Sequence, residues 1–137
     1  MRPFPDIAED FTLLDDRDER YRLLIDLGRD LEPMPAALKT DATRVRGCSA
    51  NVWVYPTGDT ARLHFLADSD AAITKGIVAL IVALVQDHPA ADIAALDIKA
   101  ALAPFDLASQ LSSNRTQGIP NMIDLIRATA ARLAGLS

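Results

Sequence analysis

The sequence contains a single cysteine, Cys48, among its 137 residues. A lone cysteine cannot close an intramolecular disulfide, and without a second thiol it cannot form a site built from several cysteines. The two histidines, His64 and His88, lie at spacings from Cys48 that match no zinc-binding pattern. The sequence therefore predicts no metal site, and whatever Cys48 does, it does through one thiol.

The chain also lacks a cluster of basic residues and a long hydrophobic run. Its 14 basic and 19 acidic side chains give a formal net charge of −5, so we expect no nucleic-acid partner. The longest aliphatic run, residues 77–85, is far too short to cross a bilayer. The first residues lack the apolar core of a signal peptide. We therefore expect no membrane association and a cytoplasmic location, where a free thiol stays reduced.

Half of the residues are hydrophobic, and the length is typical of one domain, which we expect to span residues 1–137. Apolar residues recur at helical spacing over residues 7–31, over residues 73–84 and from about Pro120 onward. Residues 52–55 and 63–66 flank Pro56-Thr57-Gly58-Asp59, which predicts a β-hairpin with a turn longer than two residues. A further strand over residues 43–46 would complete an α+β fold, with helices packed on a small antiparallel three-stranded sheet.

Cys48 lies between two of these expected strands, directly after Gly47. A free cysteine usually packs as a small hydrophobic residue. Here, however, Arg44 and Arg46 precede it, and cationic neighbours favour the thiolate, which is the nucleophilic form. Glycine at position 47 permits the backbone angles of a tight turn. The segment therefore predicts a reactive thiol on a loop.

Other polar residues have simpler interpretations. A cysteine hydrolase would need His64 or His88 as a base, but neither lies in a recognisable catalytic motif. A surface position on a strand for His64, and a position at a helix end beside the helix dipole for His88, are the more common explanations. The segment Asp68-Ser69-Asp70 supplies N-cap candidates for the helix that follows, and Arg115 is typical of a solvated loop cation.

An ordered set of short motifs runs through the chain from about Ile7 to Leu133. It comprises Leu13-Leu14-Asp15-Asp16, Arg20-Tyr21, Leu27-Gly28, Arg44-Val45-Arg46-Gly47-Cys48, Val52-Trp53, Leu63-His64-Phe65, Asp68-Ser69-Asp70-Ala71, Lys75-Gly76, Leu111-Ser112, Arg115, Gly118 and Met122. With these spacings the sequence resembles the SufE family, the sulfur-acceptor proteins that activate group II cysteine desulfurases.

The resemblance implies a fold similar to that of SufE and the IscU-like iron-sulfur scaffolds. It implies that Cys48 accepts persulfide sulfur from a group II cysteine desulfurase of the SufS or CsdA kind. The protein would stimulate that enzyme and pass the sulfur to a downstream iron-sulfur assembly scaffold. Pyridoxal phosphate belongs to the desulfurase, so this chain would need no cofactor and would be a carrier rather than an enzyme. We expect a monomer or a weak homodimer.

Other positions carry over from the resemblance. Asp70 matches an acidic residue beside the cysteine loop that affects coupling to the desulfurase, and Arg115 matches a residue used in docking. Arg46, Gly47 and Ser49 would support the loop or contact the partner. The chain departs from the pattern at Ser49 and Ala50, where many relatives have Gln and Ser.

Three alternatives stay open from the residues. The protein could be a scaffold that binds a nascent iron-sulfur cluster, although one cysteine supplies too few ligands without a partner. It could be a cysteine hydrolase that uses one of the histidines. Finally, Cys48 could be buried and inert.

Overall fold

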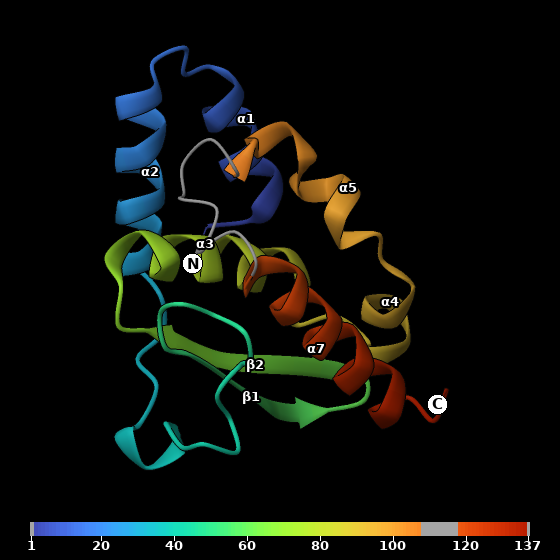
Figure 1. The fold of residues 1–137 in the computed structure, drawn as a ribbon. Coiled ribbons are helices and arrows are strands. Elements are labelled where there is room, and N and C mark those ends of the chain that lie inside the picture. Colours follow the sequence, from blue (N-terminus) through green and yellow to red (C-terminus); the bar gives the residue numbers. More distant parts are fainter. Residues whose placement is uncertain (1, 108–117, 137) are drawn as a thin grey trace.

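The structure, a computed structural model, describes residues 2–107 and 118–136 (Figure 1). Its elements are α1 (Phe4–Thr12), α2 (Arg17–Arg29), η1 (Ala36–Leu38), β1 (Val52–Asp59), β2 (Arg62–Ser69), α3 (Ala72–Val85), α4 (Ala90–Ala95), α5 (Ile98–Leu102), η2 (Ala103–Phe105) and α7 (Gly118–Leu133). The predicted α+β class is confirmed. None of the helices described is long and apolar enough to cross a membrane.

Helix α3 is the centre of the core. It lies above the hairpin in Figure 1 and packs against both β2 and α2. Most of its residues from Ile73 to Val85 are buried because both sides of the helix are covered. The crossing with α2 is close at Gly28 and Gly76, where a Cβ added to Gly28 would lie 2.9 Å from the Gly76 nitrogen. The two glycines therefore let the backbones of the helices meet.

The strands β1 and β2 pair antiparallel along their whole length, from Val52 opposite Ser69 to Asp59 opposite Arg62. Val52 and Val54 are buried, whereas Trp53 and Tyr55 lie on the other face, as the alternation predicted. The predicted long turn is wrong, because only residues 60–61 connect the strands. The Asp59 carboxylate stabilises this short turn by accepting backbone hydrogen bonds from Ala61 and Arg62, at 3.0 and 2.9 Å.

The predicted third strand is also wrong, since the sheet in the described residues has two strands. Residues 43–45 contact β1 only briefly. The Val45 N–H donates to the Val52 carbonyl at 2.7 Å, and the Val54 N–H donates to the Thr43 carbonyl at 2.9 Å. Gly47, with φ of 81°, then turns the chain away before a ladder can extend. The cysteine loop, residues 46–51, is thus attached to the edge of β1 by a short bridge.

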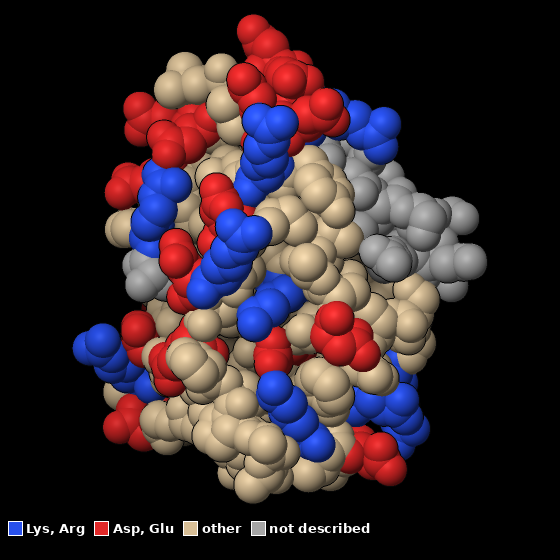
Figure 2. All heavy atoms as spheres, turned by 90° about the vertical axis from the view of Figure 1, so that its left-hand side faces the viewer, with Lys and Arg blue, Asp and Glu red and all other residues tan. Residues whose placement is uncertain are grey.

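Charged side chains of both signs intermingle on the face that α2 contributes, and no stripe of one sign covers it (Figure 2). The largely buried Asp68 carboxylate pairs with Lys39 at 2.5 Å and with Lys75 at 3.3 Å. Burial of Asp68 raises its pKa, but hydrogen bonds from Lys39, the Ser69 N–H and Lys75 outweigh this and lower the pKa overall. These contacts join the residue after η1 to β2 and α3.

Candidate functional site

The loop that carries Cys48 is fixed at its C-terminal side by Asp70. The Asp70 carboxylate accepts hydrogen bonds from the Asn51 backbone N–H at 3.0 Å and from the Asn51 side-chain amide at 2.8 Å. The Asp70 N–H donates to the Asn51 carbonyl at 3.2 Å. Asp70 is therefore not the helix cap that its position suggested, and α3 begins after Ala71 without a side-chain cap. Its carboxylate instead secures the end of the cysteine loop.

The N-terminal side of the loop is fixed by α7. The Asn121 amide donates to the Arg46 carbonyl at 2.9 Å. Gly47 allows this contact, because a Cβ at position 47 would overlap the Asn121 side-chain nitrogen. Any larger residue at this position would also have to adopt the positive φ that glycine tolerates. The loop is therefore suspended between the start of α3 and the first turn of α7.

Cys48 is half-buried and packs against Gly118, the first residue of α7. A Cβ added to Gly118 would overlap the Cys48 sulfur and lie 3.0 Å from the Cys48 Cβ. No larger residue fits at position 118 unless the loop moves. The position of the thiol is thus set by residues about seventy positions away in the sequence.

A small cavity of about 20 Å³ adjoins Cys48. Its walls come from the cysteine loop and β1, from α3 and from α7, and are formed by Cys48, Ser49, Ala50, Val52, Thr74, Ile77, Val78, Ile81, Gly118, Ile119 and Met122. Most of these side chains are apolar. The surroundings of the thiol are therefore poor in groups that could stabilise a negative charge.

Burial raises the pKa of the Cys48 thiol. The expectation that Arg44 and Arg46 would favour the thiolate is wrong for this conformation. Both arginines are exposed, and neither lines the cavity beside the sulfur. Although Arg44 and Arg46 are close to Cys48 in the sequence, they do not surround its sulfur, because the loop turns Cys48 inward while the two arginines are exposed.

The other predicted residues surround the loop. Arg46, Gly47 and Ser49 are exposed. A groove of about 450 Å³ runs beside the loop and is lined by Arg44, Val45, Arg46, Gly47, Asn121 and Leu125. Arg115 lies outside the described residues. Sequence reasoning missed Asn51, Thr74 and Asn121, and only Asn51 carried a signal, its position beside the cysteine motif.

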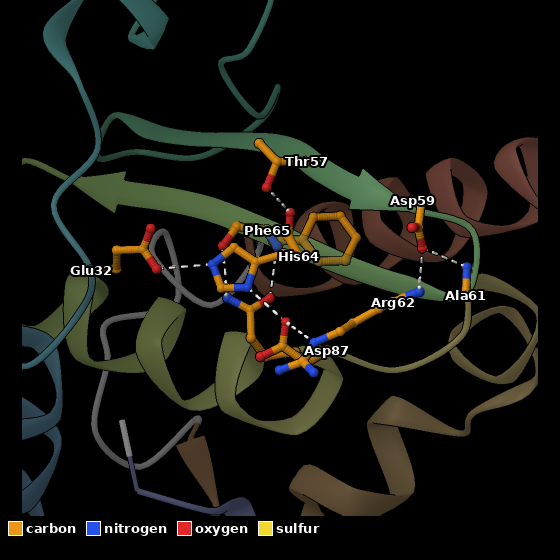
Figure 3. Close-up of polar contacts among 9 residues, drawn as sticks. Glu32, Thr57, Asp59, Ala61, Arg62, His64, Phe65 and Asp87 are labelled. Atoms are coloured by element: carbon orange, nitrogen blue, oxygen red, sulfur yellow. Dashed lines mark hydrogen bonds and ion pairs between the residues drawn. The ribbon is translucent and has the colours of Figure 1, made fainter.

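The histidines lie apart from this site, since neither lines the Cys48 cavity. His64 projects from β2, where its Nδ1 contacts Asp87 at 2.8 Å and its Nε2 contacts Glu32 at 2.9 Å (Figure 3). Both ring nitrogens are thus occupied by carboxylates. Burial lowers the pKa of His64, but Asp87 and Glu32 outweigh it and raise the pKa overall. The geometry does not support a Cys-His hydrolase.

The described residues also contain no group of three His, Cys, Asp or Glu side chains placed to hold a metal ion. The cavity beside Cys48 offers one thiol among mainly apolar groups. Such a donor set does not favour a cluster scaffold that works through this chain alone. Exchange chemistry at one sulfur is what the arrangement supports.

Comparisons with known proteins agree with the resemblance found in the sequence. The SufE family model, described as an Fe-S metabolism associated domain, matches residues 5–130. An uncharacterized SufE-like protein from Rhizobium etli is 37% identical over 134 residues, which cover 95% of this chain and 90% of the relative. The sulfur acceptor protein CsdE from Escherichia coli is 32% identical over 124 residues, which cover 90% and 84%, respectively.

A solved structure supports the fold independently. The solution structure of a hypothetical protein from Thermus thermophilus aligns with a TM-score of 0.77 at 14% identity. The alignment covers 98% of this chain and 99% of that one. The family match includes the cysteine loop, α3 and nearly all of α7, which are the elements that form the site. The chain therefore belongs to the SufE family.

Proposed function

We propose that this protein is a sulfur acceptor in iron-sulfur metabolism and that Cys48 receives persulfide sulfur from a group II cysteine desulfurase. The observation that carries the proposal is the placement of the only thiol of the chain on an anchored loop beside a small apolar cavity. Membership in the SufE family and similarity to the sulfur acceptor CsdE support the same role. The sulfur would then pass to iron-sulfur cluster assembly.

The transfer is a thiol exchange that needs no external oxidant. Cys48 first releases its proton to solvent or to a group of the partner. Its thiolate attacks the outer sulfur of the persulfide on the desulfurase, and the bond between that sulfur and the enzyme's own sulfur breaks. The enzyme sulfur leaves as a thiolate, and Cys48 carries the persulfide. The pyridoxal phosphate that generates the original persulfide belongs to the desulfurase.

The free protein holds Cys48 in a state of low reactivity, because its thiol is half-buried and its pKa is raised. Transfer therefore requires the loop to open when the partner docks. We infer that Gly47 acts as a pivot and that the contacts made by Asp70 and Asn121 define the closed state. Arg46, Ser49, Asp70 and Arg115 remain predicted to bind the partner or to support the loop.

The test is a transfer experiment with a group II cysteine desulfurase and cysteine. The Cys48 peptide should gain the mass of one sulfur atom, and the desulfurase should turn over faster. Cys48→Ser should keep the fold and lose both effects. An active desulfurase that places no sulfur on Cys48 would overturn the proposal. Undiminished stimulation by Cys48→Ser would show activation without sulfur transfer.

A further inference from the structure

Thr74 has a buried hydroxyl without a hydrogen-bond partner in the part of the chain that the structure describes. It is part of α3, whose remaining side chains are almost all apolar. A buried hydroxyl is unfavourable when nothing pairs with it, whereas valine has almost the same shape and carries no such cost. Among the described residues, the free thiol form therefore leaves the donor of the half-buried Thr74 side chain unused.

Thr74 lies close to the thiol of Cys48. It lines the same cavity as Cys48, and the cavity volume of about 20 Å³ accommodates roughly one water-sized atom. The Cys48 sulfur already packs against Gly118, so an atom added to that sulfur cannot extend toward α7. The cavity bounded by the loop, α3 and the α7 residues Ile119 and Met122 thus has room for about one additional sulfur atom.

We propose that Thr74 is a positioning residue for the persulfide form of Cys48, with its hydroxyl donating a hydrogen bond to the outer sulfur inside this cavity. The inference rests on the proposed function, since it concerns the sulfur that the acceptor carries. Threonine in a helix populates two side-chain rotamers, so the hydroxyl can turn toward the sulfur while the backbone stays in place.

The hydrogen bond has two consequences. It favours the charged form of the outer sulfur, which lowers the pKa of the persulfide. It also keeps that sulfur directed inward, away from thiol reductants. A reductant thiolate attacks the outer sulfur, takes it as a new persulfide and releases Cys48 as a thiolate. Inward positioning slows this loss until the loop opens on the next partner.

The experiment loads the sulfur without a desulfurase. Cys48 is first converted to a mixed disulfide with dithiodipyridine, which releases one pyridinethione. Sulfide then attacks the Cys48 sulfur and expels the second pyridine thiolate, leaving Cys48 as a persulfide. Wild type is compared with Thr74→Val, which removes the donor at nearly constant shape, and with Thr74→Ser, which retains it. Mass spectrometry follows the loss of the outer sulfur to dithiothreitol at several pH values.

We expect Thr74→Val to lose its outer sulfur roughly tenfold faster than wild type, as for the loss of one hydrogen bond to a charged group. Thr74→Ser should behave like wild type. The pH at which the outer sulfur ionises should rise only in Thr74→Val. In the thiol form, Thr74→Val should be as stable as wild type or more stable, because the valine leaves no unpaired hydroxyl.

Equal lifetimes in wild type and Thr74→Val would overturn the inference, as would a Thr74→Ser variant that behaves like Thr74→Val. A thiol form destabilised by Thr74→Val would show that the hydroxyl serves the resting fold instead. Because the loading bypasses the desulfurase, these outcomes are independent of the transfer experiment. Failure of transfer from the desulfurase would remove the proposed function and leave these lifetimes unaffected.

Discussion

Replacement of Gly118 by alanine tests whether α7 sets the position of Cys48. The added Cβ would overlap the Cys48 sulfur and approach the Cys48 Cβ to 3.0 Å and the Cα to 3.2 Å. Gly118 is not among the glycines with positive φ, so its backbone accepts alanine without strain. The three nearest described atoms all belong to Cys48, so the substitution perturbs the packing of α7 against the cysteine loop.

The size of the effect follows from competing contributions. Extra volume in a packed site costs about 1–3 kcal/mol, and better helix propensity returns at most about 1 kcal/mol. The Asn121 contact that holds Arg46 is a neutral hydrogen bond with a net contribution of about 1 kcal/mol. Since overpacking outweighs this bond, the loop should move rather than the helix. We expect a net loss of about 1 kcal/mol in unfolding free energy.

The assay is the rate of Cys48 alkylation by iodoacetamide at neutral pH, followed by mass spectrometry, with urea unfolding in parallel. Gly118→Ala should react severalfold faster than wild type, because the displaced sulfur gains solvent and its pKa falls toward the ordinary value. Gly135→Ala is a control at the end of α7. Gly135 has φ of 74° and open space around it, so alanine strains the backbone without approaching Cys48.

The two variants should lose similar stability, but only Gly118→Ala should accelerate alkylation. A Gly118→Ala variant that reacts at the wild-type rate, or no faster than Gly135→Ala, would refute the packing argument.

Three further predictions concern other contacts. Asp70→Asn keeps one acceptor for Asn51 but loses the second, so alkylation of Cys48 should accelerate and the free energy of unfolding should fall by about 1 kcal/mol. An unchanged alkylation rate would contradict the role of Asp70 in anchoring the cysteine loop. Gly76→Ala places a Cβ against the Leu24 backbone carbonyl, which cannot move aside, so the free energy of unfolding should fall by about 3 kcal/mol. Urea unfolding measures this loss, and a wild-type midpoint would contradict the close crossing of α2 and α3. The folded-state pKa of His64 is raised, so the protonated imidazole stabilises the folded state. This stabilisation is fully present below the ordinary pKa of 6.5 and is lost as the pH rises through the folded-state pKa. The stability difference between wild type and His64→Gln should therefore shrink from pH 6 to pH 9 in urea unfolding, and a constant difference would refute the assignment.

The helices could be predicted well because their apolar spacing is a local property. Residues from Ile73 to Val85 form a helix that is mostly buried, and the alternation of Val52 and Val54 with Trp53 placed one face of β1 correctly. The prediction of a third strand was also wrong for a local reason. Residues 43–45 have suitable composition, but Gly47 ends the pairing after one bridge, and composition does not report how far a ladder extends.

The chemistry of the site was harder to predict because it depends on contacts between distant segments. The loop and its cysteine were identified, but the state of the thiol depends on Gly118, on α3 and on the Asn121 contact with Arg46. Gly118, Asn121 and α3 all lie far from Cys48 in the sequence. The adjacent arginines suggested a thiolate, and the fold reverses that expectation by turning one side chain inward.

A raised thiol pKa is compatible with an acceptor because two effects partly cancel. Each unit of increase lowers the thiolate fraction at neutral pH about tenfold, yet a more basic thiolate is intrinsically about threefold more nucleophilic. The net loss from basicity is therefore small, and access to the half-buried sulfur becomes the stronger control. A partner that opens the loop would remove both restrictions together, because exposure restores the thiolate fraction as it admits the incoming persulfide. Burial would thus restrict exchange to the docked complex, and Cys48 would stay unreactive toward other disulfides in the meantime.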